Sequence, residues 1–191
     1  MLVLLALTFV LSTFAFNFNV TLPVLAKVTL HGHSYVYGLL SAVFGAGALV
    51  GALGAASLGR ASTKVLLVGG VVFTGGELLL APIHSAYLAG VLLFLIGAGF
   101  TAWSANSNAS LQLAAPDHLR GRVIGLYFYA FNGTGAIAGI MTGWLCDVGG
   151  TELAFVFSGI LGLVATVGAA LTLGWTPRLV PRRRATEPRH A

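Results

Sequence analysis

Six long apolar runs, separated by short polar breaks, dominate this sequence. They cover approximately residues 2–25, 35–58, 64–82, 86–113, 121–145 and 151–174. At ~1.5 Å per helical residue, each run is long enough to cross a hydrocarbon core of ~30 Å. The sequence therefore predicts an all-α membrane protein with one domain of six transmembrane helices over residues 1–176, followed by a basic cytoplasmic tail over residues 177–191.

Composition supports a surface that faces lipid. Charged residues make up 8% of the 191 residues, whereas a soluble domain carries roughly 25%. The mean hydropathy of +0.93 agrees. The formal net charge of +5 comes from basic residues in the polar breaks and the tail, so we expect the lipid bilayer as a partner and no nucleic acid. Cys146 is the only cysteine, which excludes an intramolecular disulfide and a thiolate cluster built from this chain alone.

The basic residues also predict the orientation. Nine of the ten Lys and Arg residues fall on one side of the predicted membrane, namely Arg60, Lys64, Arg120, Arg122, Arg178, Arg182, Arg183, Arg184 and Arg189. Only Lys27 falls on the other side. The positive-inside rule then puts both termini in the cytoplasm. We expect a multi-pass protein of the inner (plasma) membrane.

Two glycine-rich segments indicate an internal repeat. Gly45-Ala-Gly47-Ala-Leu-Val-Gly51 and Gly133-Thr-Gly135-Ala-Ile-Ala-Gly139 have identical glycine intervals. Three helices per copy would turn the second copy over in the membrane, which gives two inverted three-helix repeats of the kind many secondary transporters contain. The alternative is that glycines at this spacing only let helices pack closely.

The segment Leu111-Gln-Leu-Ala-Ala-Pro-Asp-His-Leu-Arg-Gly-Arg-Val123 resembles the connection between helices 10 and 11 of major facilitator superfamily exporters, especially the enterobactin-exporter-like branch. Asn17-Phe-Asn-Val-Thr-Leu-Pro-Val-Leu-Ala26 resembles helix 7 of that branch, and Tyr37-Gly-Leu-Leu40 with Phe44-Gly-Ala-Gly47 resembles helix 8. The resemblance runs from about Leu2 to Leu173.

The resemblance implies the C-terminal six-helix half of a twelve-helix transporter. A second six-helix half or a homodimer would then be the partner, and a truncated or split gene product remains an alternative. Residues 51–64 keep Gly54, Gly59, Arg60 and Lys64 of the family's loop signature but contain no acid. A charge-relay latch in that loop is therefore not expected.

Asp117, Arg120 and Arg122 lie at the inner mouth of the fifth run. Asp117 is a candidate N-cap. Two arginines at a helix N-terminus oppose the helix dipole, so we interpret the three residues as a cytoplasmic gate that pairs with another half. The alternative is that they anchor the helix among lipid headgroups.

Glu77 is the only acid in the interior of an apolar run. An ionisable side chain at the bilayer centre costs on the order of 3 kcal/mol, so Glu77 is the candidate for proton coupling. It stands five residues before Pro82, and the alternative is that its carboxyl group reaches the outer interface.

Amide side chains inside the apolar runs need hydrogen-bond partners. Asn108 and Gln112 share a helix face at a spacing of four residues, whereas Asn106 does not share it. With neighbouring aromatic residues, the amides predict an amphipathic substrate cavity lined by Asn17, Asn106, Asn108, Gln112, Tyr127, Phe131 and Asn132. The alternative for any single amide is a contact that joins helices.

Other features of the sequence say less about function. Pro23 is expected to break or kink the outer end of the first helix; it is either a gate hinge or, the interpretation we favour, the helix end. His31 and His33 provide too few ligands for a closed metal site, and the Arg182–Arg184 run suits anionic lipid. The sequence contains no nucleophile–base pair, no phosphate-binding loop and no metal-ligand cluster, so we expect no enzyme, no cofactor and no metal.

These observations favour half of a secondary active, proton-coupled exporter of small, partly hydrophobic molecules that works by alternating access. A non-transporting fragment or regulatory half is the alternative function.

Overall fold

The computed structural model describes residues 2–30, 34–59 and 61–174, and all regular structure in these ranges is helical. The predicted tail over residues 177–191 lies outside the described residues, as do His31, His33 and Arg60. The helices are α1 (Leu2–Val10), η1 (Leu11–Ala15), α2 (Phe18–Val24), η2 (Leu25–Thr29), α3 (Ser34–Ser57), α4 (Thr63–Leu80), α5 (Ala86–Ala114), η3 (Asp117–Leu119), α6 (Arg120–Asn132) and α7 (Gly135–Gly174).

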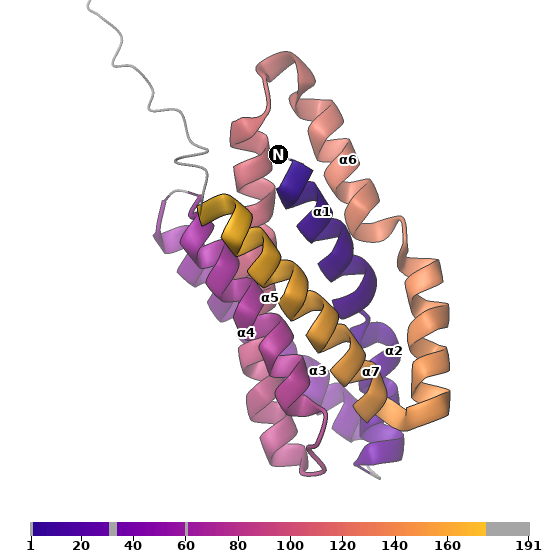
Figure 1. The fold of residues 1–191 in the computed structure, drawn as a ribbon. Coiled ribbons are helices and arrows are strands. Elements are labelled where there is room, and N and C mark those ends of the chain that lie inside the picture. The colour runs from indigo at the N-terminus through magenta and orange to yellow at the C-terminus, as the bar shows by residue number, and fades with distance from the viewer. Residues whose placement is uncertain (1, 31–33, 60, 175–191) are drawn as a thin grey trace, which may run out of the picture.

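Five helical stretches of the described chain are long and apolar enough to cross a membrane. They are Leu2–Thr29, Ser34–Ser57, Thr63–Leu80, Ala86–Ala114 and Asp117–Thr172. The last stretch has 56 residues, far more than the ~20 that one crossing needs. It contains a sharp turn at Gly149 and Gly150, where the φ of Gly150 is 68°, a left-handed conformation that glycine adopts without steric cost. Figure 1 shows the chain reversing direction there, between the orange and the yellow arms of α7.

The first apolar stretch is interrupted at Phe16 and Asn17, where the π-helical turn η1 ends and α2 begins. Pro23 lies inside α2, and the chain continues as the π-helical turn η2 to Thr29. The prediction that the helix ends at Pro23 is therefore wrong. Proline removes one N–H donor from the helix, but α2 passes directly into η2, so the chain stays helical beyond Pro23.

Glycines let α3, α4 and α5 pack closely. A Cβ atom at Gly47 or Gly51 of α3 would overlap the backbone of Phe94 or Ala98 in α5. On another face of α5, a Cβ atom at Gly99 would lie 2.8 Å from the carbonyl oxygen of Gly69 in α4. Small residues of this kind replace side-chain interdigitation by backbone contact. Helix α4 also packs against the second arm of α7 (Figure 1).

The two predicted repeat segments differ in local structure. Gly45–Gly51 lies within the continuous helix α3. Gly133 and Thr134 instead form the break between α6 and α7. The equal glycine spacing therefore serves a helix contact in the first segment and a helix interruption in the second.

Candidate functional site

A cavity of about 950 Å³ opens between α3, α5 and α6. Its volume lies at the upper end of the range for small-molecule sites, about 300–1,000 Å³. Helix α3 contributes a wall of small residues that includes Ala52 and Ala56, and α6 contributes Tyr127, Phe128 and Phe131. Helix α5 contributes the amides, and Arg120 stands at the first residue of α6. The surface is apolar and aromatic with a few polar groups.

Five of the seven predicted cavity residues line this one space, namely Asn106, Asn108, Gln112, Tyr127 and Phe131. Asn108 and Gln112 are in contact as their spacing predicts, since Gln112 Nε2 donates a hydrogen bond to Asn108 Oδ1. Tyr127 Oη donates to the carbonyl oxygen of Ser104 at 3.3 Å. Two turns of α5 and one face of α6 therefore converge.

Asn106 has a structural part in this wall. Its Oδ1 accepts a hydrogen bond from the backbone N–H of Ser62 at 2.9 Å, and its Nδ2 donates to the carbonyl oxygen of Ala102 at 2.8 Å. Ser62 in turn is the N-cap of α4, with its Oγ accepting from the N–H of Val65. Asn106 thus holds the start of α4 against α5. For this amide the structure agrees with the alternative given above, a contact that joins helices.

The remaining two predicted cavity residues lie elsewhere. Asn132 is exposed and donates to the carbonyl oxygen of Phe128 at 3.3 Å, and it does not line the cavity. Asn17 is buried at the interruption of the first helix, where its Nδ2 donates to the carbonyl oxygen of Thr13 at 2.8 Å. Its side chain replaces a backbone donor that the interruption removes.

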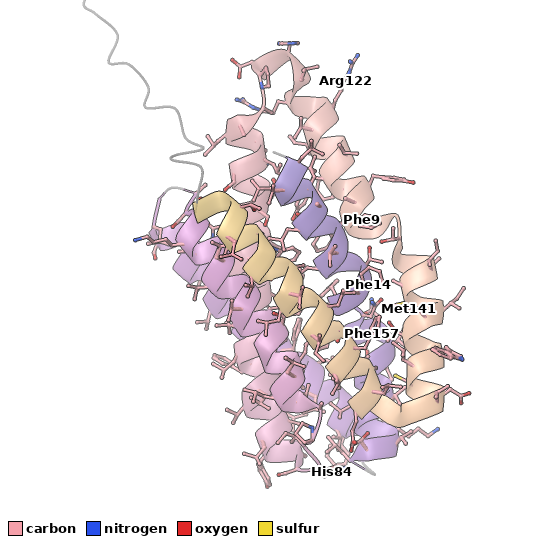
Figure 2. The ribbon with its side chains drawn as sticks, in the orientation of Figure 1. Phe9, Phe14, His84, Arg122, Met141 and Phe157 are labelled. Carbon is pink, nitrogen blue, oxygen red and sulfur yellow. The ribbon has the colours of Figure 1, made fainter. Side chains whose placement is uncertain are left out.

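The three predicted gate residues differ in their contacts: two of them form an ion pair, and the third points away from the molecule. Arg120 Nη2 lies 2.8 Å from Asp117 Oδ1, with 46% and 92% of the two side chains exposed. A pair this exposed contributes about 0–1 kcal/mol. Arg122 is exposed and points away from the molecule at the end of the bundle (Figure 2). Asp117 is the first residue of η3, and the N-cap of α6 is Leu119. The prediction that Asp117 caps this helix is therefore wrong. The short 3₁₀ turn η3 separates Asp117 from the start of α6.

Two helix interruptions are joined beside the cavity. Ser12 Oγ, in η1, lies 2.8 Å from the carbonyl oxygen of Ala130 in α6 and 2.6 Å from that of Thr8, and its one proton is shared between the two. Thr13 Oγ1 lies 2.6 Å from Thr134 Oγ1, at the break between α6 and α7. The bend in the first helix and the break in the last stretch therefore lie side by side and are linked by hydroxyl groups.

Aromatic rings connect the same interruption to the cavity. Phe16 stacks on Phe100 with centroids 4.2 Å apart and planes 5° apart, and it lies 5.8 Å from the cavity residue Phe131. Phe131 also stacks on the buried Trp103 at 6.3 Å. Further along, Phe14 and Phe157 meet edge to face at 6.3 Å, as Figure 2 shows between the first helix and α7.

Glu77 lies away from the cavity, on α4 where that helix packs against α7. Its side chain is 1% exposed. The alternative that it reaches the outer interface is therefore wrong. Ser158 of α7 is within hydrogen-bonding reach of the carboxyl group, and Oε2 has no hydrogen-bond partner among the described residues. Across these residues, no group of three or more His, Cys, Asp and Glu could hold a metal ion.

Sequence reasoning missed part of the lining. Phe128 and the small residues Ala52, Ala55, Ala56, Ala105 and Ala109 line the cavity but were not predicted. The signal was present in the spacing. Ala105 and Ala109 recur four residues apart beside Asn108 and Gln112, and small residues on a helix face leave room that larger ones would fill.

The comparison with protein families gives one match. The family model of the Major Facilitator Superfamily matches residues 3–191. No curated protein matches the chain. The family match covers the cavity helices and the turn at Gly149 and Gly150 alike.

Proposed function

From the premise that this chain belongs to the Major Facilitator Superfamily, and is therefore a multi-pass membrane transporter chain, we propose that it is the C-terminal six-helix half of a proton-coupled exporter in the inner membrane. Its substrates would be small, partly hydrophobic molecules, and both of its termini would be cytoplasmic. The observation that carries the proposal is the amphipathic cavity between α3, α5 and α6.

The turn in α7 supports six crossings. The stretch Asp117–Thr172 divides at Gly149 and Gly150 into two arms. Each arm is long enough for one crossing at ~1.5 Å per residue. With the four stretches before it, this gives six. Counted this way, the chain is two sets of three helices, which is the arrangement that the inverted-repeat proposal requires.

An incomplete cavity supports a partner. The cavity is open to the surroundings of the chain, and Phe128 in its lining is 54% exposed. Next to the lining residues Ala52 and Ala56, Leu49 and Leu53 are 61% and 62% exposed on α3. A second six-helix half, or a second copy of this chain, would close the space. The enterobactin-exporter-like branch remains the most specific family assignment that we propose.

The buried carboxyl group supports proton coupling. An unpaired carboxylate is costly among packed apolar helices. Ser158 is within reach of the Glu77 carboxyl group, and Oε2 has no hydrogen-bond partner among the described residues. Movement of α4 against α7 would change the environment of the group and so drive binding and release of a proton. The cavity and the proton site would then be coupled through helices, since Glu77 does not line the cavity.

The proposal is tested in inverted membrane vesicles from cells that express the chain at native level in its own genomic context. We expect an imposed proton gradient to drive uptake of an amphipathic fluorescent substrate, and an uncoupler to abolish it. The matched control is the chain with Phe131→Ala and Gln112→Ala, which removes cavity contacts.

Three other results would count against parts of the proposal. Uptake that is equal with and without the chain would favour the alternative, a non-transporting fragment or regulatory half. Uptake that survives the uncoupler would retain the transporter and reject proton coupling. Chemical conversion of the substrate during uptake would reject the expectation that the chain is not an enzyme.

A further inference from the structure

We propose that the cavity selects an organic anion. The acidic group of this anion would bind Arg120 and take the place that Asp117 now occupies beside it. This inference rests on the proposed transport function and gives that site a substrate class. The apolar part of the anion would lie on the rings of Phe128 and Phe131. Arg120 would thus determine specificity, whereas Arg122, two residues later on the same helix, would not.

The polar groups that remain available in the lining favour an anion. Asn106 is satisfied on both sides of its amide. The hydrogen bond between Gln112 Nε2 and Asn108 Oδ1 leaves Asn108 Nδ2 and Gln112 Oε1 without a partner in the described part of the chain. Arg120 adds guanidinium N–H groups at the mouth. The available groups are therefore mostly donors, and a carboxylate or a similar acid is a pure acceptor.

The charges around the cavity point the same way. Arg120 is the one charged residue among the described lining residues. Glu77 is buried at the contact between α4 and α7, and Glu152 pairs with His84 at 3.1 Å. Figure 2 shows His84 at the end of the bundle opposite Arg122. Asp117 lies beside Arg120 but outside the lining. A cation in this cavity would therefore meet a guanidinium group and no carboxylate among the described lining residues, while an anion would be attracted to the mouth.

The bond between Arg120 and Asp117 is suited to exchange. Asp117 is almost fully exposed and Arg120 is half-exposed, so water competes with their contact and the pair is weak. An acid held in the cavity, with its apolar part against Phe128 and Phe131, presents its oxygens from a partly desolvated position. Hydrogen bonds to a charged group are stronger there. Substrate binding would thus release Asp117 from the same arginine.

The test uses the full chain purified in mild detergent with whatever partner remains bound. Three probes share one ring system and differ in charge: 2-naphthoate is anionic, 2-naphthamide is neutral and 2-naphthylmethylamine is cationic. Binding of radiolabelled 2-naphthamide reports the cavity, and the other two compounds are measured as competitors. We expect 2-naphthoate to compete at a roughly tenfold lower concentration than the amine, in keeping with one charge-assisted contact.

Two variants separate the proposed role from general positive charge. Arg120→Gln should remove the advantage of 2-naphthoate and leave the binding of 2-naphthamide within about twofold, because only the acid uses the guanidinium group. Arg122→Gln, the matched control, should leave all three probes unchanged. Equal loss of 2-naphthoate binding in both variants would overturn the proposal in favour of nonspecific attraction.

The remaining outcomes distinguish this inference from the proposed function. An amine that competes as well as 2-naphthoate overturns the anion preference but leaves the cavity as a substrate site. If 2-naphthamide binds but Arg120→Gln leaves the advantage of 2-naphthoate unchanged, Arg120 is not the residue that selects the anion. If none of the three compounds binds, the cavity is not a binding site for amphipathic molecules and both proposals fail.

Discussion

At the scale of single residues, position along a helix decides which polar groups face the cavity. Asn108 and Gln112 are four residues apart on α5, so they meet, and both line the space. That contact could be predicted from spacing alone. Asn132 is equally polar, but it lies at the last residue of α6 and faces outward. Its place depends on the break that follows it, which spacing does not reveal.

Glu77 gives the sharpest prediction at this scale. Glu77→Gln keeps the shape and the reach to Ser158 but cannot bind or release a proton. We expect gradient-driven accumulation of substrate to be lost while downhill exchange of substrate across the membrane continues. Both are measured in vesicles with and without an imposed proton gradient. The chain should remain folded, because a neutral amide is less costly than a carboxylate at a buried position.

Glu152→Gln is the control for this prediction. Glu152 is an exposed acid that pairs with His84, and it lies directly after the turn of α7 at Gly149 and Gly150. It should leave accumulation unchanged. Undiminished accumulation by Glu77→Gln would show that the buried acid has a structural role only.

At the scale of elements, the helix interruptions are the features that the sequence did not predict. The first helix bends at Phe16 and Asn17, where neither residue is glycine or proline, while Pro23, the usual breaking residue, lies within α2. At the bend, the hydroxyl groups of η1 contact the distant segment around Ala130 and Thr134. Local propensity contains no information about such partners, whereas the apolar lengths of α3, α4 and α5 fix those helices well.

The hydroxyl pair between the interruptions should contribute measurable coupling. In a double-mutant cycle with Thr13→Val and Thr134→Val, we expect a coupling free energy of roughly 0.6–1.7 kcal/mol, the range found for hydrogen bonds between membrane helices. Unfolding by a denaturing detergent is the measurement. A cycle that combines Thr13→Val with Thr101→Val, whose hydroxyl bonds within its own helix to Gly97, should be additive. Additivity in the first cycle as well would mean that the two interruptions are independent.

Two glycines of α3 provide a matched test of helix packing. Gly47→Ala places a Cβ atom into the backbone of Phe94, whereas Gly45→Ala meets nothing within 4 Å. Overpacking costs about 1–3 kcal/mol, so Gly47→Ala should lower the melting temperature in detergent. Gly45→Ala should leave it unchanged or raise it, because alanine favours the helix by about 1 kcal/mol over glycine. Equal stability of the two variants would contradict the close contact between α3 and α5.

At the scale of the whole molecule, the question is which exposed apolar surface faces lipid and which faces a partner. Leu53 on α3 and Val68 on α4 are both 62% exposed. Leu53 lies beside the cavity-lining Ala52, while α4 contributes no residue to the lining. If a second half closes the cavity, Leu53 is buried by it and Val68 remains in lipid.

A photo-crosslinking amino acid at each position tests this in intact membranes. Position 53 should yield a product the size of two chains, whose mass spectrum identifies either this chain or a second six-helix chain of the same family. Position 68, with equal exposure, should yield lipid adducts only. Lipid adducts at both positions would mean that the cavity opens directly to the bilayer, in which case the chain acts without a second wall and alternating access between two halves is excluded. A two-chain product at position 68 alone would place the partner on the α4 side, where it could not close the cavity.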